Sequence, residues 1–209
     1  MDQTNTIFML DDDKATRRSL ALALELAGYR IRTYASAEDM LADLDPEQPG
    51  CLLLDLRMPG ISGLEVQEML NARGCTMPVI FMSAFAAVPA TVRAIRGGAI
   101  DFLEKPCPME VLTERIEHAL EIDRSQRGER NWQGHIRSRA AELTRREAEV
   151  LHFVTEGLSN KEAARQLHIS PRTVEKYRAR VMEKMEAESI PELCRMASVL
   201  SDADPAPRP

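Results

Sequence analysis

Short apolar runs of strand length alternate with amphipathic stretches through the first half of the chain. The apolar runs cover residues 6–11, 29–35, 51–55, 78–83 and 99–106. Each is followed by a helix-like stretch, and these cover 14–27, a segment beginning at 36, 64–72, 89–96 and 108–122. This alternation predicts an α/β fold with a parallel sheet. Right-handed crossovers then favour five strands in the flavodoxin-like order 2-1-3-4-5.

The second half of the chain has helical periodicity without strands. Residues 123–140 are polar and rich in Arg, Gln and Gly, which is typical of a linker. Residues 141–200 predict a small all-α domain, and the ending SDADPAPRP (201–209) predicts a disordered tail. The first domain then covers residues 1–122.

A helix-turn-helix pattern lies within the helical domain. A helix at 160–167 is followed by a tight turn and by a second helix that begins with Ser170 as its cap. On the second helix Val174 belongs to an apolar face, whereas Glu175 and Lys176 belong to the opposite face. That face could enter a DNA major groove, or the pair of helices could bind another protein, and the spacing leaves both interpretations open.

Charge separates the two halves of the chain more clearly than overall composition does. The net charge of −6 combines 11 basic and 18 acidic residues up to position 120 with 16 basic and 15 acidic residues after it. Basic side chains concentrate at 159–184, which suits a polyanion. The four cysteines form no C-x-x-C motif, so we expect reduced packing residues. With no apolar run of membrane-spanning length and no signal-peptide pattern, we expect a cytoplasmic protein without membrane contact.

Acidic residues follow two strands that the predicted order makes neighbours. Asp11 and Asp12 end the first strand, and Asp55 ends the third. Because ligands of open α/β sheets bind beyond the carboxyl ends of the strands, these carboxylates mark the expected site. Three close carboxylates repel one another unless a cation joins them, and an all-oxygen cluster selects a hard ion such as Mg²⁺. Ser83 and Lys105 end the fourth and fifth strands.

This set of residue types suits phosphoryl transfer. The protein then has to align a nucleophile and neutralise oxygens, and Asp55 could form an aspartyl phosphate. Each residue also has a simpler explanation when taken alone. Asp55 could begin a loop, Ser83 could cap a helix and Lys105 could lie at the rim of the sheet.

Residues 5–122 resemble the receiver domain of two-component response regulators. The resemblance rests on the acidic pair, the loop DLRMPGISG, the hydroxyl at 83 and the Lys-Pro step at 105–106. It implies that Asp55 accepts phosphate from a histidine of a separate sensor kinase, and that a cis bond precedes Pro106. The implied Mg²⁺ ligands are Asp11, Asp12, Asp55 and the main-chain carbonyl of Arg57. The implied switch residues are Ser83, Phe102 and Lys105, although Phe102 could equally be a core residue.

Residues 142–200 resemble the DNA-binding domain of the LuxR group. The stretches LTRREAEVL and SPRTVE, taken with DLRMPGISG, are most similar to the FixJ branch of response regulators. The expected contacts to double-stranded promoter DNA are Lys161, Arg172, Thr173, Glu175, Lys176 and Arg180. Two departures stand out: Tyr177 replaces a histidine that is common in the group, and Phe85, Ala86 and Ala87 replace small polar residues after the switch hydroxyl.

These features predict a transcriptional regulator, not a turnover enzyme, in which phosphorylation of Asp55 promotes a homodimer and DNA binding. RNA polymerase is a further candidate partner. One rival hypothesis keeps the fold but uses the receiver, unphosphorylated, as a dimerisation or ligand-sensing module. The other is a phosphatase of the haloacid dehalogenase type, which needs an aspartate two residues after its nucleophile, where this chain has Arg57.

Overall fold

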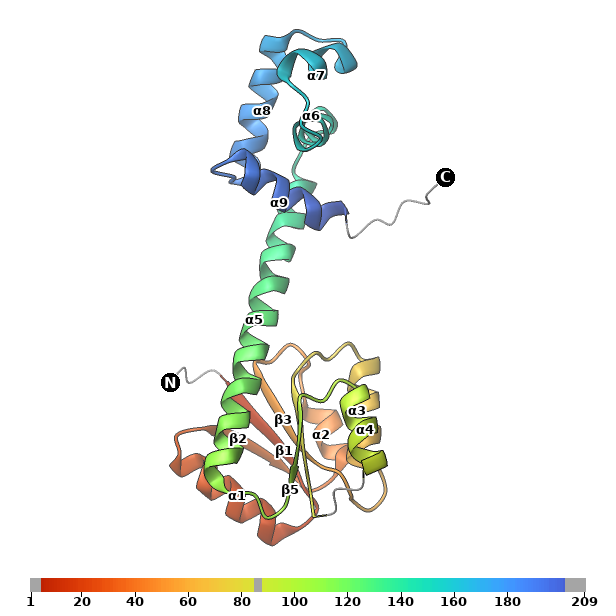
Figure 1. Ribbon diagram of the computed structural model, residues 1–209, viewed down its shortest axis with the longest axis vertical. Coiled ribbons are helices and arrows are strands. Elements are labelled where there is room, and N and C mark those ends of the chain that lie inside the picture. Colours follow the sequence, from red (N-terminus) through yellow and green to blue (C-terminus); the bar gives the residue numbers. More distant parts are fainter. Residues whose placement is uncertain (1–4, 85–87, 202–209) are drawn as a thin grey trace. The chain divides into compact units, whose positions relative to one another are not determined.

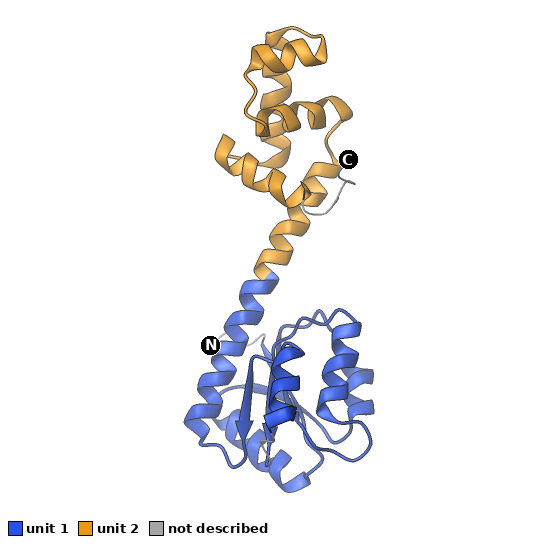
Figure 2. Cartoon of the chain, turned by 45° about the vertical axis from the view of Figure 1, so that its right-hand side comes forward, with its two compact units in different colours: residues 1–127 blue, residues 128–209 orange. Residues whose placement is uncertain are grey.

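A computed structural model of the protein describes residues 5–84 and 88–201. The chain divides into two compact units, with residues 1–127 in unit 1 and residues 128–209 in unit 2 (Figure 2). Phe85, Ala86 and Ala87, which depart from the family pattern in sequence, lie outside the described residues. Most of the tail, residues 202–209, lies outside them as well.

Unit 1 is built on a five-stranded sheet in which every neighbouring pair of strands is parallel. The order is β2-β1-β3-β4-β5, which confirms the predicted topology. The strands are β1 (Thr6–Leu10), β2 (Arg30–Tyr34), β3 (Gly50–Asp55), β4 (Val79–Ser83) and β5 (Asp101–Glu104). Leu10 pairs with Leu54, so β1 and β3 end at the same level of the sheet.

Helices cover both faces of this sheet (Figure 1). They are α1 (Lys14–Leu26), α2 (Ala37–Asp43), α3 (Gly63–Ala72), α4 (Val88–Arg96) and α5 (Met109–Ala141). Successive strand residues point to opposite faces, so the central strands supply two cores. Phe8 packs in one core with residues of α2, α3 and α4, whereas Ile7 packs in the other with residues of α1 and α5.

Helix α5 is longer than the sequence predicts. The residue pattern predicts an end at about residue 122 and a linker after it, but the helix continues to Ala141. The expected end is therefore wrong, because Arg and Gln, which recur in this segment, have high helix propensity although the segment also contains Gly128 and Gly134. Side chains four residues apart add to it, as when Gln133 donates to Glu129 at 2.9 Å. The exact border between domain and linker stays a prediction.

Two paired residues in the middle of α5, Asp123 and Arg127, also bond to the backbone of other parts of unit 1. Arg127 Nε donates to both carboxylate oxygens of Asp123 at 2.9 Å, and the Asp123 side chain is only 2% exposed. Asp123 also accepts the backbone N–H of Gly50 at 3.0 Å, at the beginning of β3. The Arg127 guanidinium donates further to the carbonyls of Glu47 and Gln48. The bonds from Asp123 and Arg127 to Glu47, Gln48 and Gly50 join residues 73 to 80 positions apart, and we name this group the α5 anchor.

Unit 2 is entirely helical in its described part, as the sequence predicts. After the end of α5 come α6 (Arg145–Thr155), α7 (Asn160–Leu167), α8 (Pro171–Met185) and α9 (Ile190–Ser201). The core of unit 2 includes Ile136 of α5 and the fully buried Val174 and Val181 of α8. Ser201 still belongs to α9, so the expected disordered tail does not begin there.

The cysteines are free thiols, as the sequence analysis expects. Cys51 and Cys75 are buried in unit 1, and burial raises the pKa of the Cys51 thiol to about 12. Such a thiol stays protonated and serves as a packing group. In the described ranges, no helix has the length and apolar composition that crossing a membrane requires.

Candidate functional site

Three carboxylates gather where β1 and β3 end. The side chains of Asp11, Asp12 and Asp55 each offer an oxygen, and these oxygens all lie within 4.8 Å of one another. Asp11 directly follows β1 and Asp55 is the last residue of the neighbouring β3, so the in-register parallel pairing brings them together. Asp11 is buried, Asp55 is half-buried and Asp12 is exposed. The cluster therefore opens to solvent on the side of Asp12.

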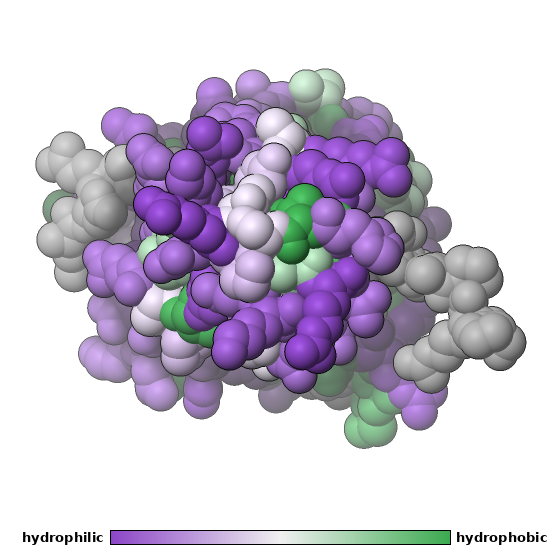
Figure 3. Space-filling view, turned by 90° about the horizontal axis from the view of Figure 1, so that it is seen from above, coloured by the Kyte–Doolittle hydropathy of each residue, from purple (hydrophilic) through white to green (hydrophobic). Residues whose placement is uncertain are grey.

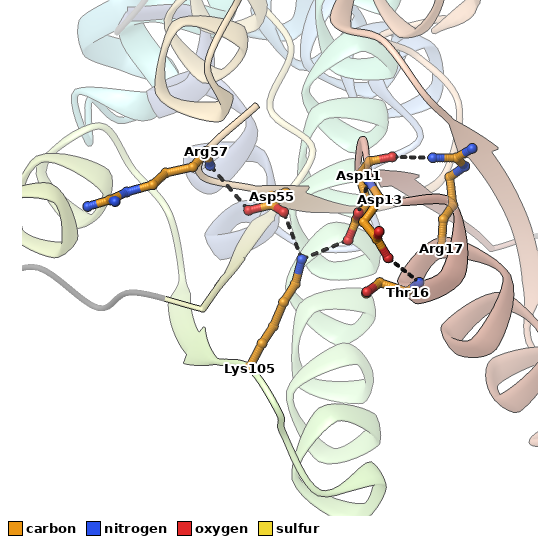
Figure 4. A network of polar contacts seen from close by, with 7 residues as sticks. All are labelled: Asp11, Asp13, Thr16, Arg17, Asp55, Arg57 and Lys105. Carbon is orange, nitrogen blue, oxygen red and sulfur yellow. Dashed lines mark hydrogen bonds and ion pairs between the residues drawn. The ribbon is translucent and has the colours of Figure 1, made fainter. Parts of the chain in front are cut away.

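Lys105 lies between two of these carboxylates (Figure 4). Its Nζ atom is 2.7 Å from Asp11 Oδ2 and 2.8 Å from Asp55 Oδ2. Its backbone N–H donates to the carbonyl of Ser83 at 2.9 Å, and the peptide bond to Pro106 is cis, as the family resemblance implies. The short fifth strand therefore delivers an ammonium group into the acidic cluster.

The electrostatics of this group follow from burial and pairing. Burial raises the pKa of the Asp11 carboxyl, and the hydrogen bond from Lys105 offsets only part of that effect. Burial alone would lower the pKa of the Lys105 ammonium, but its hydrogen bonds to Asp11 and Asp55 together outweigh burial and raise it. Lys105 is thus a stable cation at the site.

The third aspartate of the first loop has a different role. Asp13 is the N-cap of α1, and its carboxylate accepts the backbone N–H of Thr16 at 2.6 Å. This bond lowers the pKa of Asp13. Asp13 is therefore turned toward the helix, and only Asp11 and Asp12 remain for the acidic cluster.

Two further residues that the sequence analysis does not select hold the backbone of the site. Arg17 of α1 donates through Nη1 to the main-chain carbonyl of Asp11 at 2.6 Å. Gly63 begins α3, and a Cβ atom there would lie 2.1 Å from the carbonyl oxygen of Asp55. The loop DLRMPGISG contains this glycine, so its signal was present in the sequence, whereas Arg17 carries no comparable signal.

The remaining predicted site residues of unit 1 surround the cluster at different depths. Arg57 donates its backbone N–H to Asp55 Oδ1 at 3.2 Å, and its side chain is exposed. Ser83 is 1% exposed at the end of β4. Phe102 of β5 is half-buried and stacks on Phe81 with ring centroids 6.4 Å apart. Phe102 therefore packs against the core, which is the alternative that the sequence analysis left open for it.

The donor set of the acidic cluster fits Mg²⁺. All three side chains present carboxylate oxygens, and one edge is exposed enough for water to complete a coordination shell. Neither sulfur nor imidazole ligands take part, so the chemistry of the cluster favours a hard cation over a transition metal.

In unit 2, α7 and α8 form a helix-turn-helix. Ser159 and Ser170 cap the two helices, and Pro171 occupies the first turn of α8. Between the helices His168 adopts a left-handed conformation with φ of 54°. Arg178 donates to Asn160 Oδ1 at 3.1 Å and so joins the middle of α8 to the beginning of α7.

Most of the expected DNA contacts are available on this surface. The exposed residues are Lys161, Arg172, Glu175, Lys176 and Arg180. Thr173 is half-buried, and its hydroxyl lies 2.8 Å from that of Ser170. The end of unit 2 that carries α7 and α8 is covered mainly by hydrophilic side chains (Figure 3). Val174, Val181 and Met185 face the core, so the two faces of α8 are those that the sequence predicts.

Comparison with known proteins agrees with both halves of this description. The family model described as "Response regulator receiver domain" matches residues 7–117, and the one described as "Bacterial regulatory proteins, luxR family" matches residues 141–197. The transcriptional regulatory protein FixJ of Azorhizobium caulinodans is 43% identical over 206 residues, which cover 99% of this chain and 97% of FixJ. The chain belongs to the response regulator family.

Other response regulators are similar over almost the same length. The response regulator protein TodT of Pseudomonas putida is 37% identical over 202 residues, which cover 97% of this chain and 89% of TodT. The solved structure of the response regulator StyR gives a TM-score of 0.85 at 38% identity and covers 93% of this chain and 98% of StyR. Full-length FixJ from B. japonicum gives a TM-score of 0.58 at 38% identity, with coverage of 97% and 100%.

As a response regulator with a LuxR-type DNA-binding domain, the protein is a regulator of transcription. The expected resemblance to the FixJ branch is confirmed, as is the expected pair of folds. The family acts in transcription and is not one of turnover enzymes, so the phosphatase hypothesis is set aside. Receiver domains of this family generally bind Mg²⁺ at an acidic pocket, and unit 1 has such a pocket.

Proposed function

We propose that Asp55 accepts a phosphoryl group from a histidine of a sensor kinase, and that this modification controls dimerisation and DNA binding. The observation that carries the proposal is the group of Asp11, Asp12, Asp55 and Lys105 at one edge of the sheet. The Asp55 side chain is 13% exposed and that of Asp11 only 3%, which leaves Asp55 better placed to meet a donor. Membership of the response regulator family supports the same role.

The transfer itself asks little of the protein beyond alignment and charge neutralisation. A carboxylate oxygen of Asp55 attacks the phosphorus, and the new P–O bond forms as the P–N bond to the kinase histidine breaks. The imidazole nitrogen keeps the electron pair of the broken bond. Asp11, Asp12, Asp55 and the main-chain carbonyl of Arg57 would hold Mg²⁺, which neutralises phosphoryl oxygens when bound.

After transfer, Lys105 and Ser83 would each contact a phosphoryl oxygen. Lys105 must then exchange its bonds to Asp11 and Asp55 for a bond to the new group, since its ammonium lies 2.7 and 2.8 Å from those carboxylates beforehand. Phe102 would follow this movement, because it packs beside Phe81 on the neighbouring strand. The altered surface favours a homodimer through a population shift.

The regulated activity would be promoter recognition by α8 of each copy in the dimer. Lys161 and Thr173 at helix beginnings suit backbone phosphates, while Arg172, Glu175, Lys176 and Arg180 suit the major groove. A two-fold dimer would read an inverted repeat with half-sites about one helical turn apart. RNA polymerase is the candidate partner at the promoter, and a bacterial regulator that binds the chromosome acts in the cytoplasm.

Mass measurement tests the phosphoacceptor directly. The full chain is incubated with acetyl phosphate and Mg²⁺, and its intact mass is recorded together with its oligomeric state. We expect a mass increase of one phosphoryl group and a shift toward dimer, with both lost in Asp55→Asn. Asp39→Asn on the exposed face of α2 is the matched control and should behave as the parent does. Full labelling of Asp55→Asn would refute the assignment.

A further inference from the structure

Arg17 makes an unusual contact for a charged residue on a helix. Its Nη1 atom donates to the main-chain carbonyl of Asp11 at 2.6 Å, so the guanidinium reaches back from α1 to the end of β1 (Figure 4). The side chain is half-buried, whereas the neighbouring Arg18 is exposed. A short bond from a guanidinium to a carbonyl is charge-assisted and stronger than an ordinary backbone bond.

The carbonyl that Arg17 binds lies just beyond the last backbone hydrogen bond between β1 and β2. The N–H of Asp11 still donates to the carbonyl of Tyr34 in β2 at 3.2 Å. Beyond this bond the chain leaves the sheet, and the Asp11 carbonyl belongs to the peptide group that joins Asp11 to Asp12. Because the peptide group is planar, fixing that carbonyl also fixes the N and Cα atoms of Asp12, from which its side chain extends.

The orientation of the Asp12 side chain depends on the backbone more than the orientations of Asp11 and Asp55 do. Asp11 accepts bonds from Lys105 and from the N–H of Asp13, and Asp55 accepts bonds from Lys105 and from the N–H of Arg57. No such bond to the Asp12 carboxylate is found among residues 5–84 and 88–201. The orientation of Asp12 toward the cluster then rests on its two flanking peptide groups. Arg17 holds the one before Asp12, and the bond from the Asp13 N–H to Asp11 holds the one after it.

We propose that Arg17 is a positioning residue for cation binding, and that it acts by orienting the peptide group between Asp11 and Asp12. The inference rests on the proposed function, since it takes the acidic cluster to be a Mg²⁺ site. Groups that orient a metal ligand without touching the metal commonly contribute about tenfold or more to affinity.

A simple charge effect would act in the opposite direction. A guanidinium close to a cation site repels the cation, so removing its charge should tighten binding. Orientation predicts weaker binding when the same charge is removed. The sign of the change therefore separates the two explanations without reference to its size.

The test measures Mg²⁺ binding to the unphosphorylated full chain by isothermal titration calorimetry, with the rise in melting temperature on adding Mg²⁺ as a second readout. Arg17→Gln removes the charge and the long reach, Arg17→Lys keeps the charge with a single donor group, and Arg18→Gln is the matched control. We expect about tenfold weaker binding for Arg17→Gln, partial recovery for Arg17→Lys, and a change of less than about twofold for Arg18→Gln.

Unchanged or tighter Mg²⁺ binding by Arg17→Gln would overturn the inference and leave the proposed function intact. Equal weakening in Arg17→Gln and Arg18→Gln would overturn it too, since Arg18 does not hold the carbonyl. If the parent protein itself bound no Mg²⁺, the proposed function would fail and the inference with it. Circular dichroism compares the folded content of the parent and all variants. If Arg17→Gln does not fold, Mg²⁺ binding by Arg17→Lys still tests the inference.

Discussion

At the residue scale, Lys105 both stabilises the acidic cluster and occupies it. Its ammonium bonds to Asp11 and Asp55, and its side chain is only 15% exposed. Without this cation two close carboxylates, one of them fully buried, would repel each other in a poorly solvated place. Any metal that binds the cluster must therefore compete with Lys105 for the same oxygens.

Lys105→Met tests this competition. We expect a lower melting temperature without metal, because the carboxylates lose their counter-charge, and Mg²⁺ binding tighter by about tenfold, because the competing cation is gone. Thermal melts across a Mg²⁺ titration measure both effects. Lys14→Met, which removes an exposed charge at the beginning of α1, serves as the control. Weaker Mg²⁺ binding by Lys105→Met would show that Lys105 helps to form the metal site.

A second residue pair gives unit 2 a pH dependence. Glu147 of α6 accepts a hydrogen bond from Lys184 Nζ at 2.7 Å and one from the N–H of Thr144, and these bonds lower its pKa from 4.5 to about 2. A lowered pKa in the folded state stabilises the fold above pH 4.5. That contribution is lost as the pH falls from about 4.5 toward 2.

We expect Glu147→Gln to remove this part of the acid sensitivity. The parent should lose on the order of 2 kcal/mol of unfolding free energy across that pH range, and Glu147→Gln should show a flatter profile from a lower starting point. Urea unfolding at each pH, followed by the fluorescence of Trp132, the single tryptophan, measures the unfolding free energy. Glu149→Gln is the control, since Glu149 pairs with Arg145 and Arg146 at the surface. Parallel profiles for parent and Glu147→Gln would contradict the assignment.

At the element scale, the α5 anchor joins the middle of helix α5 to backbone groups at residues 47–50, which are distant in sequence. Asp123 and Arg127 form a pair that is almost fully buried, with the Arg127 side chain 14% exposed. Removing one partner of such a pair leaves the other charge without compensation and costs about 3 kcal/mol.

We predict that Arg127→Ala lowers the stability of unit 1 by on the order of 3 kcal/mol. The double variant Asp123→Asn/Arg127→Ala should be less destabilised than the sum of the single changes, because no unpaired charge remains. Calorimetry of the full chain measures these differences, and Arg124→Ala, an exposed position on the same helix, is the control. Strict additivity of the two changes would mean that the pair does not act as a unit.

The helix α8 carries the prediction on sequence recognition. Glu175 and Lys176 are exposed on the face opposite the buried Val174, so they are placed to contact bases, whereas Lys161 at the beginning of α7 suits phosphates. We expect Glu175→Ala and Lys176→Ala to change preference at particular base pairs by about 1 to 3 kcal/mol. Lys161→Ala should instead weaken all sites alike and reduce the salt dependence. A binding-site selection in which Glu175→Ala and Lys176→Ala enrich the same sequence as the parent would contradict the assignment of these side chains to the major groove.

The sheet edge of unit 1 and helix α5 show which features could be predicted from the sequence and which could not. The strand ends were predictable because a parallel sheet brings Asp11, Asp55 and Lys105 to one edge, whatever the details of packing. The helix beyond 122 was not, because its polar composition hides bonds to Gly50 and to loop carbonyls about eighty positions away. Arg17 was missed for a related reason. Its partner is a main-chain carbonyl, and no pattern of side chains reports such a bond.

At the scale of the whole molecule, one chain joins a phosphoacceptor candidate in unit 1 to a DNA-binding candidate in unit 2. The acidic surplus of the first 120 residues and the basic stretch at 159–184 assign these two chemistries to different units. The central claim is that the state of Asp55 sets the affinity of α7 and α8 for DNA. A coupling of this kind is typically worth 5- to 150-fold in affinity, or about 1 to 3 kcal/mol.

The most direct measurement is the dissociation constant for a selected DNA site, followed by fluorescence anisotropy at fixed salt. It is recorded for the parent and for Asp55→Asn, each before and after treatment with acetyl phosphate and Mg²⁺, with intact mass recorded on the same samples. The account predicts that labelled parent binds about tenfold more tightly or better, and that Asp55→Asn binds equally under both conditions. Equal affinity of labelled and unlabelled parent, or the same gain in Asp55→Asn, would contradict it and favour a receiver that works without phosphorylation.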